Sequence, residues 1–239
     1  MAKTTILPLS VDSLGFRTRD VTVLSAVSFR VEAGSRSIVL GPNGAGKSVL
    51  LRLMHGLLTP TNGSVRWALT DAASIRRAQA MVFQRPVMLR RSVRENIELA
   101  LHIAGHVSAA REAAMAALEQ VGLAHLANRP ARLCSGGEQQ RIALARAWAL
   151  KPDVLFLDEP TASLDPAATR AIEEVVQAMH RAGTTIIMTT HDLGQARRLA
   201  DRVLFLHHGR LVEDAPAVTF FAQPTSPDAA AFIRGELLW

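Results

Sequence analysis

The stretch SIVLGPNGAGKS, residues 37–48, runs from a short aliphatic segment directly into a glycine-rich loop. The segment after it, VLLRLMHGL at 49–57, has the leucine spacing of a helix. A strand, a loop of this form and a helix, in this order, make a phosphate-binding loop, because backbone amides and the positive end of the helix surround an anion. We therefore predict that phosphate binds at Gly41, Pro42, Asn43, Gly44, Ala45, Gly46, Lys47 and Ser48.

Lys47 and Ser48 close this loop and carry its charge chemistry. In loops of this kind the lysine ammonium neutralises the β- and γ-phosphates of a nucleotide, and the hydroxyl binds Mg²⁺. The alternative is an ordinary glycine-rich turn, which leaves the agreement of strand, motif and helix unexplained. The loop therefore predicts a nucleotide and Mg²⁺ as its ligands.

The composition indicates a folded protein that works in the cytoplasm. Of the 239 residues, 49% are hydrophobic and 20% are charged, so the chain is long enough to bury a core. It has no apolar run of the roughly 20 residues that a membrane-spanning helix needs, and its first residues lack a signal-peptide pattern. Cys134 is its one cysteine, which excludes an internal disulfide. The net charge of +6 fits nucleic acid, an anionic membrane surface or nucleotide phosphates alike.

Aliphatic segments alternate with helical patterns along the chain, which predicts an α/β fold with buried parallel strands. Asp165 and Pro166 have the residue types of an N-cap and a first helical position, and their helix is expected to end near Gly183. Alternating apolar residues at 21–31 predict antiparallel strands at the front of the chain. The parallel strands are expected at 37–40, 81–83, 154–157, 184–190 and 203–206.

The middle of the chain is rich in Ala, Leu and Arg and is expected to be helical. The predicted fold is thus an α/β core that carries the phosphate loop, with an N-terminal antiparallel β subdomain and an α-helical insertion.

The segment VLFLDEP at 154–160 ends an apolar strand in two carboxylates, Asp158 and Glu159. At the end of a parallel strand, Asp158 can reach the Mg²⁺ shell and Glu159 can polarise an attacking water. A solvated loop or a helix cap would use the same residues. Together with the phosphate loop, the pair predicts a hydrolytic centre.

The segment CSGGEQQR at 134–141 leads into another helical pattern. Ser135 has the residue type of an N-cap, and Gly136 and Gly137 leave backbone amides uncovered at the helix start, which makes a second anion-binding turn. One nucleotide does not need two such turns, so this one is expected to contact the γ-phosphate of ATP held by another subunit. A plain capped helix is the alternative.

These motifs, with Gln84, the loop SLD at 163–165 and His191, resemble in order those of the ATP-binding cassette (ABC) family, the ATPase subunits of ABC transporters. The resemblance implies a head-to-tail homodimer that holds two ATP molecules between the phosphate loop of one subunit and residues 135–137 of the other. It also implies that hydrolysis drives transmembrane permease subunits, served indirectly by an extracytoplasmic substrate-binding protein. It implies an α/β P-loop NTPase (RecA-like) core in a single ABC ATPase domain at 5–239, with the helical subdomain at 86–150 inserted in it. The ATPase would lie on the cytoplasmic face of the cell membrane.

The resemblance also implies roles for single residues. Glu159 is implied to be the general base, His191 to contact the γ-phosphate, and Gln84 to sense Mg²⁺ and the attacking water. Asp165 is implied to cross the dimer interface. The structural alternatives are a strand-end polar residue for Gln84, a helix cap for His191 and an N-cap for Asp165, where both roles are compatible. The implied Mg²⁺ site comprises Ser48, Gln84 and Asp158.

Four positions depart from the family pattern. Val49 stands where the family has a threonine, so a hydroxyl contact to phosphate is lost while the backbone contact remains. Cys134 replaces a leucine and is expected to preserve packing, and Glu138 replaces a glutamine. The chain has no tyrosine to stack on adenine. Phe16 is the candidate for that role, and a core position in the β layer is its alternative.

The end of the chain, from THDLGQ at 190–195 to FIRGELLW at 232–239, resembles importers of oxyanions. We therefore expect tungstate first as the cargo, then molybdate or phosphate. A transporter ATPase for another cargo, a soluble ABC ATPase acting on ribosomes or DNA, and a regulator without turnover are the alternatives. We expect no nucleic-acid partner. The HHG turn at 207–209 is expected to be a solvated hairpin rather than a metal site.

Overall fold

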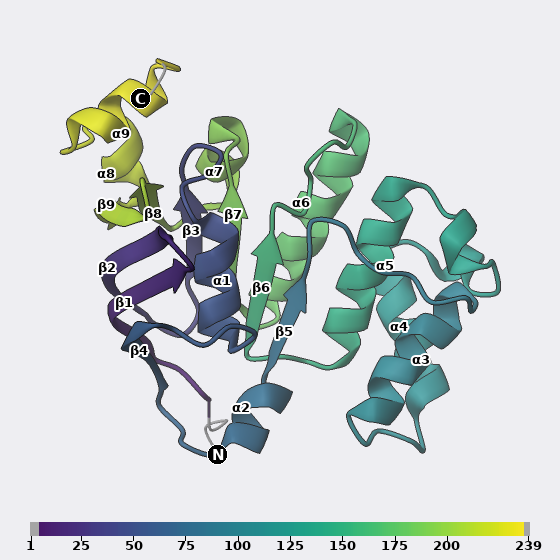
Figure 1. Ribbon diagram of the computed structural model, residues 1–239. Helices are drawn as coiled ribbons and strands as arrows, with labels where there is room; N and C mark the ends of the chain where they lie inside the picture. Colours follow the sequence, from purple (N-terminus) through teal and green to yellow (C-terminus); the bar gives the residue numbers. More distant parts are fainter. Residues whose placement is uncertain (1–4, 237–239) are drawn as a thin grey trace. The chain divides into compact units, whose positions relative to one another are not determined.

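The computed structural model describes residues 5–236, which form two compact units (Figure 1). The first unit contains residues up to 75 and those from 185 onward, and the second contains residues 76–184. Among residues 5–236, no helix is both long and apolar enough to span a membrane.

A small antiparallel sheet in the first unit has the strand order β2-β1-β4, as expected for the front of the chain. In β2 the apolar alternation holds from Val27 to Val31, where every second side chain is buried. It breaks before Ala26, whose φ of 50° marks an irregularity, so that Val21 is 62% exposed. The strands are β1 (Leu9–Thr18), β2 (Val21–Val31) and β4 (Asn62–Trp67).

The other strands of the first unit are ordered β7-β3-β8-β9. β3 pairs in parallel with both β7 and β8, and its residues Ile38, Val39 and Leu40 are fully buried, which confirms the expected buried strands. The elements are β3 (Arg36–Leu40), α1 (Lys47–His55), β7 (Thr185–Thr190), α7 (Leu193–Leu199), β8 (Arg202–His207), β9 (Arg210–Pro216), α8 (Ala217–Ala222) and α9 (Pro227–Ile233).

The second unit combines two parallel strands with the expected helices. Its strand β5 ends at Val82 and not at Phe83, whose side chain is 40% exposed. The helices α3, α4 and α5 contact one another and are drawn in teal in Figure 1. The elements are β5 (Gln79–Val82), α3 (Val93–Ile103), α4 (Ala110–Gln120), the short 3₁₀ helices η1 (Ala124–Leu126) and η2 (Ala131–Leu133), α5 (Gly136–Ala149), β6 (Val154–Asp158) and α6 (Pro166–Arg181); α2 (Ala72–Arg77) spans the boundary between the units.

The helix α6 begins where its capping residues predicted. The Asp165 side chain accepts a hydrogen bond from the amide of Ala168 at 2.9 Å, and Pro166 is the first helical residue. The apolar positions at helical spacing are all buried, namely Ile172, Val175, Val176 and Met179. The alternation of strand and helix therefore confirms the α/β fold class.

The turn between β8 and β9 differs from its prediction. It is a hairpin, and His208 is exposed, but His207 is only 7% exposed and is not solvated. His207 Nδ1 lies 3.0 Å from Oδ2 of Asp228, at the start of α9. The expectation of a solvated turn was wrong at His207 because a helix 21 residues later in the chain covers it.

Candidate active site

The glycine-rich loop joins β3 to α1, as its sequence predicted. Gly46, the last residue before the helix, has φ of 98°, in the left-handed region that favours glycine. A Cβ at Gly46 would lie 2.8 Å from Cδ2 of Leu24 and 3.1 Å from the carbonyl oxygen of Val23, so β2 leaves little room for a side chain there. The backbone angle favours glycine at this end of the loop, and the close approach of β2 adds to that preference.

The N-terminus of α1 can accept an anion. No side chain caps it, and its first turn contains no acidic residue. The first amides of a helix lack partners inside the helix, and the helix dipole places partial positive charge there. By contrast, α5 and α6 are capped by Ser135 and Asp165. The start of α1 thus keeps the donors that a phosphate group needs.

Lys47 adds a full positive charge to this loop. Its side chain is 5% exposed, and Nζ donates hydrogen bonds to the carbonyl oxygens of Gly41 at 2.8 Å and Pro42 at 3.1 Å. The ammonium is therefore held against the loop backbone rather than in solvent. Ser48 and Val49 follow in the first turn of α1 and are half-buried.

Other segments of the first unit brace the loop. The amide of Gly209, in the β8–β9 turn, donates to the carbonyl of Ala45 at 3.2 Å, and the carbonyl of Gly209 accepts from the amide of Ser25 at 2.9 Å. Sequence reasoning missed this role of Gly209 and that of Asp228, which holds His207 beside it. The HHG turn was the only available signal, and it does not identify its partners.

His191 and Phe16 belong to the same unit as the loop. His191 is exposed directly after β7, and the cap of α7 is Asp192, whose side chain accepts from the amide of Gln195 at 3.0 Å. The alternative of His191 as a helix cap is therefore wrong. Phe16 is half-buried and lies opposite Leu24, the residue that approaches Gly46. Its contact with adenine stays a prediction.

The second unit brings together Gln84 and the two carboxylates. Val82 of β5 pairs with Leu157 of β6, so the two strands end at the same edge of the sheet. Gln84 and Glu159 each lie two residues beyond that pair. Asp158 is 3% exposed, whereas Gln84 is exposed and Glu159 half-buried. Glu159 has φ of 44°, unusual for a residue with a side chain.

Ser135 caps α5 in a reciprocal arrangement. Its Oγ accepts from the amide of Glu138 at 3.3 Å, and its own amide donates to Oε2 of Glu138 at 2.6 Å. The bond from the Ser135 backbone lowers the pKa of the Glu138 carboxyl, which keeps it ionised. Cys134, just before the cap, is 5% exposed, and its burial raises the pKa of the thiol. Cys134 is therefore buried, as its predicted packing role requires.

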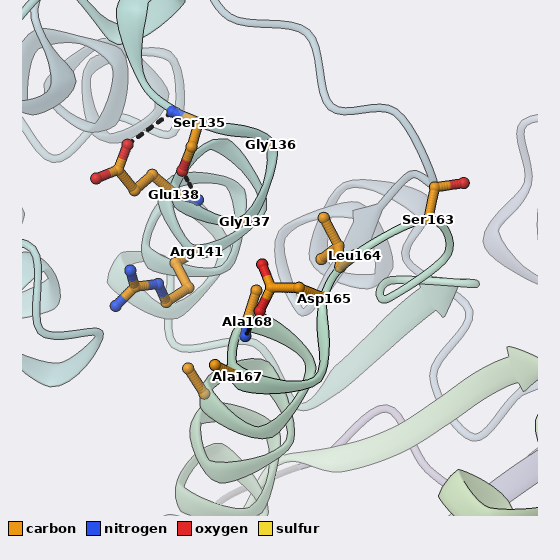
Figure 2. A pocket seen from close by; sticks show the side chains of 11 residues that line it. Ser135, Gly136, Gly137, Glu138, Arg141, Ser163, Leu164, Asp165, Ala167 and Ala168 are labelled. Atoms are coloured by element: carbon orange, nitrogen blue, oxygen red, sulfur yellow. Dashed lines mark hydrogen bonds between the residues drawn. The ribbon is translucent and has the colours of Figure 1, made fainter.

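A cavity of about 520 Å³ opens at this end of α5 (Figure 2). Residues 135–137 line it from one helix, and Ser163, Leu164 and Asp165 line it from the segment that leads into α6. The side chain of Glu138 points away from Asp165, toward the Ser135 backbone. The cavity is thus bordered by a serine hydroxyl and the glycines predicted to meet an anion.

The predicted site residues are divided between the units. The first unit holds residues 41–49, Phe16 and His191, and the second holds Gln84, Asp158, Glu159, the Ser135 turn and Asp165. Sequence reasoning missed side chains that fasten the segment after Gln84. Gln140 Nε2 donates to the carbonyl of Phe83 at 3.3 Å, and Arg132 Nε donates to that of Met88 at 2.9 Å. Both donors lie near the Ser135 motif in sequence, but nothing in the sequence indicates their acceptors.

Arg146 of α5 also holds the segment after Gln84, and its substitution tests how much this contact contributes to the stability of the protein. Both terminal nitrogens lie 3.3 Å from the carbonyl oxygen of Val87, and burial lowers the pKa of the guanidinium. Arg146→Met keeps an unbranched apolar stem in place of the arginine methylenes but removes the donors. We expect it to lower the free energy of unfolding by about 1–2 kcal/mol, measured by urea denaturation.

Arg170→Met is the matched control, since the Arg170 side chain is 83% exposed and pairs with the exposed side chain of Glu174. This control should change the free energy of unfolding by less than about 0.5 kcal/mol. Equal effects of the two substitutions would show that the Val87 contact contributes nothing.

A family model described as ABC transporter matches residues 24–162. This chain belongs to the ABC transporter family. The ABC chain is 38% identical over 237 residues to the phosphate import ATP-binding protein PstB 2 of Natronomonas pharaonis, covering 91% of this chain and 83% of that protein. It is 40% identical over 194 residues to the tungstate uptake system ATP-binding protein TupC of Peptoclostridium acidaminophilum, covering 80% and 91%.

The structure of cbiO1 from Clostridium perfringens, part of the ABC transporter complex cbiONQ, matches with a TM-score of 0.79. It is 28% identical, and the match covers 90% of each chain. This likeness confirms the P-loop NTPase fold predicted from the sequence. The ABC chain is the ATP-binding subunit of an importer, and it hydrolyses ATP.

Proposed function

We propose that this ATPase works as a head-to-tail homodimer that drives the permease of an oxyanion importer. The observation that carries the ATPase part is the uncapped start of α1 beside the buried ammonium of Lys47, which suits nucleotide phosphates. The proposal treats residues 5–239 as one ATPase domain, with the helical subdomain at 86–150 carrying Ser135. The domain lies on the cytoplasmic face of the membrane, where the permease provides the membrane span.

The dimer is supported by the cavity at the start of α5. One nucleotide at residues 41–48 does not require a second anion-binding turn in the same chain. In the proposed dimer, the hydroxyl of Ser135 and the amides of Gly136 and Gly137 meet the γ-phosphate of ATP held by the other subunit. Asp165, which lines the same cavity, faces that subunit as well.

The residues assigned to Mg²⁺ have the right donor chemistry. Ser48 offers a hydroxyl, Gln84 an amide oxygen and Asp158 a buried carboxylate, and Mg²⁺ prefers oxygen ligands. When bound with ATP, the ion would neutralise charge that develops on the phosphates. Oxygen donors from Ser48, Gln84 and Asp158 therefore fit the ion that the phosphate loop predicts.

We assign the remaining site residues the following roles in ATP binding and hydrolysis. Lys47 holds the β- and γ-phosphates, and Glu159 accepts a proton from the attacking water as the general base. Gln84 lies at the same sheet edge as Glu159 and orients that water. His191, exposed after β7, contacts the γ-phosphate and stabilises the negative charge of the transition state. Phe16 supports the adenine ring.

The proposed cargo of the importer is an oxyanion. Support comes from the two relatives whose names specify phosphate import and tungstate uptake. We place tungstate first, then molybdate and phosphate. In such a system a separate extracytoplasmic binding protein and the permease select the cargo, so the ATPase itself carries no cargo site. These importer relatives leave the alternative of action on ribosomes or DNA without support.

The test is reconstitution in liposomes with the permease and binding protein encoded by neighbouring genes. We expect tungstate-loaded binding protein to raise the rate of phosphate release at least about threefold over the protein without cargo. Molybdate, phosphate and glutamate serve as comparison cargos. Stimulation by glutamate alone would reject the oxyanion assignment and leave the ATPase intact. An absence of ATP hydrolysis in every arm would reject the enzyme as well.

A further inference from the structure

Two small residues meet where the helices α5 and α6 pack against each other. Gly137 is the second residue of α5, and a Cβ built on it would lie 2.8 Å from Cβ of Ala168. Real Cβ atoms essentially never come that close, so the helices pack here only because one partner has no side chain. At the neighbouring Gly136, a Cβ would meet only Cδ2 of Leu164, at an ordinary 3.5 Å. The close contact is thus specific to Gly137.

Ala168 also contacts the residue that caps α6. Its amide donates to Oδ1 of Asp165 at 2.9 Å, while its methyl group faces Gly137. Figure 2 shows Ala168 between the first turn of α5 and Asp165. Both of these flank the cavity described above. One alanine therefore contacts the Ser135 turn through its side chain and Asp165 through its backbone.

We propose that Ala168 is a positioning residue, whose methyl contact with Gly137 fixes the Ser135 turn and Asp165 as one rigid unit. This inference rests on the proposed function, in which both groups face ATP held by another subunit. A methyl group added at Gly137 would push the two helix starts apart by several tenths of an ångström. Misplacement of a catalytic group by about 1 Å can cost about 100-fold in rate, so the shift would be visible in kcat.

The test combines three variants of the full-length chain, Gly137→Ala, Ala168→Gly and the double variant, with kcat and KM measured for Mg²⁺-ATP. We expect Gly137→Ala to lower kcat at least about tenfold. Ala168→Gly alone removes the methyl contact and should also lower kcat, though less than Gly137→Ala does. The double variant removes the clash and should recover to within about threefold of Ala168→Gly alone. A double variant as inactive as Gly137→Ala would overturn the proposal, because glycine would then be required for another reason.

Gly136→Ala is the matched comparison on the same helix. Its new methyl group does not face Ala168, so Ala168→Gly should not restore the activity that Gly136→Ala loses. Rescue of both alanine variants by Ala168→Gly would contradict a specific contact. Thermal unfolding of each variant identifies any loss of folded protein, and the rates are compared per folded molecule.

Ala168→Val tests the contact from the other helix and does not depend on the folding of Gly137→Ala. It enlarges the side chain that faces Gly137 and should lower kcat to a similar extent. An unchanged kcat in Ala168→Val would overturn the proposal. Failure of the wild-type chain to hydrolyse ATP would instead reject the proposed function, so the two failures are distinguishable.

Discussion

Glu159→Gln should lower the rate of phosphate release at least about 100-fold while ATP binding is retained, because an amide of the same size cannot accept the proton from water. Asp158 beside it is buried and unchanged, so the assigned Mg²⁺ shell keeps its carboxylate. With hydrolysis blocked and ATP bound, we expect a closed dimer to accumulate. Phosphate release, ATP affinity and the mass of the complex in the presence of ATP measure these outcomes.

Glu174→Gln is the control for this substitution. Glu174→Gln removes the same charge from an exposed position on α6, where the Glu174 side chain is 68% exposed and pairs with Arg170. The control should keep the wild-type rate. Phosphate release from Glu159→Gln at the wild-type rate would exclude Glu159 as the general base and leave the phosphate loop assignment unaffected.

Lys47→Met should weaken ATP binding about 100-fold. The ammonium is buried, and loss of one partner in a desolvated charge pair typically costs about 2–5 kcal/mol of binding free energy. A 100-fold change in Kd corresponds to about 2.7 kcal/mol, which lies within that range. The carbonyl oxygens of Gly41 and Pro42 also lose a donor, so the loop is less well held in the free protein. Equilibrium binding of a fluorescent ATP analogue at fixed Mg²⁺ measures the effect.

Lys151→Met provides the comparison, since Lys151 is exposed in the turn before β6. It removes the same charge from the chain but leaves the loop intact, so its Kd for ATP should lie within twofold of wild type, roughly the spread of an exposed-site substitution. An unchanged Kd in Lys47→Met would contradict the assignment of residues 41–48 to phosphate.

The elements that could be predicted from the sequence are those set by local pattern. The strand before the loop, the cap at Asp165 and the buried face of α6 all depend on residues within one or two helical turns of each other. The irregularity at Ala26 could not be predicted, because alternation alone does not reveal a residue with positive φ. That irregularity changes which residues of β2 face the core.

The contacts that complete the candidate site could not be predicted for a different reason. Gln140 reaches the carbonyl of Phe83 across 57 positions, and Asp228 reaches His207 across 21. The acceptors and donors in these pairs are common residue types, and only the folded chain brings them together. The close approach of Gly137 and Ala168 is hidden in the same way, since small residues at a helix start have many explanations.

The start of α1 without a side-chain cap has a consequence for stability. Its N-cap, Gly46, offers no side-chain acceptor, which costs a helix on the order of a few tenths of a kcal/mol relative to Ser or Asp, and a bound phosphate supplies that acceptor. The bound nucleotide thus completes the hydrogen bonding of the folded state at this helix start. At an ATP concentration about 100 times its Kd, linkage adds about 2.7 kcal/mol to the free energy of unfolding. Thermal unfolding therefore reports nucleotide occupancy directly, without any measurement of transport.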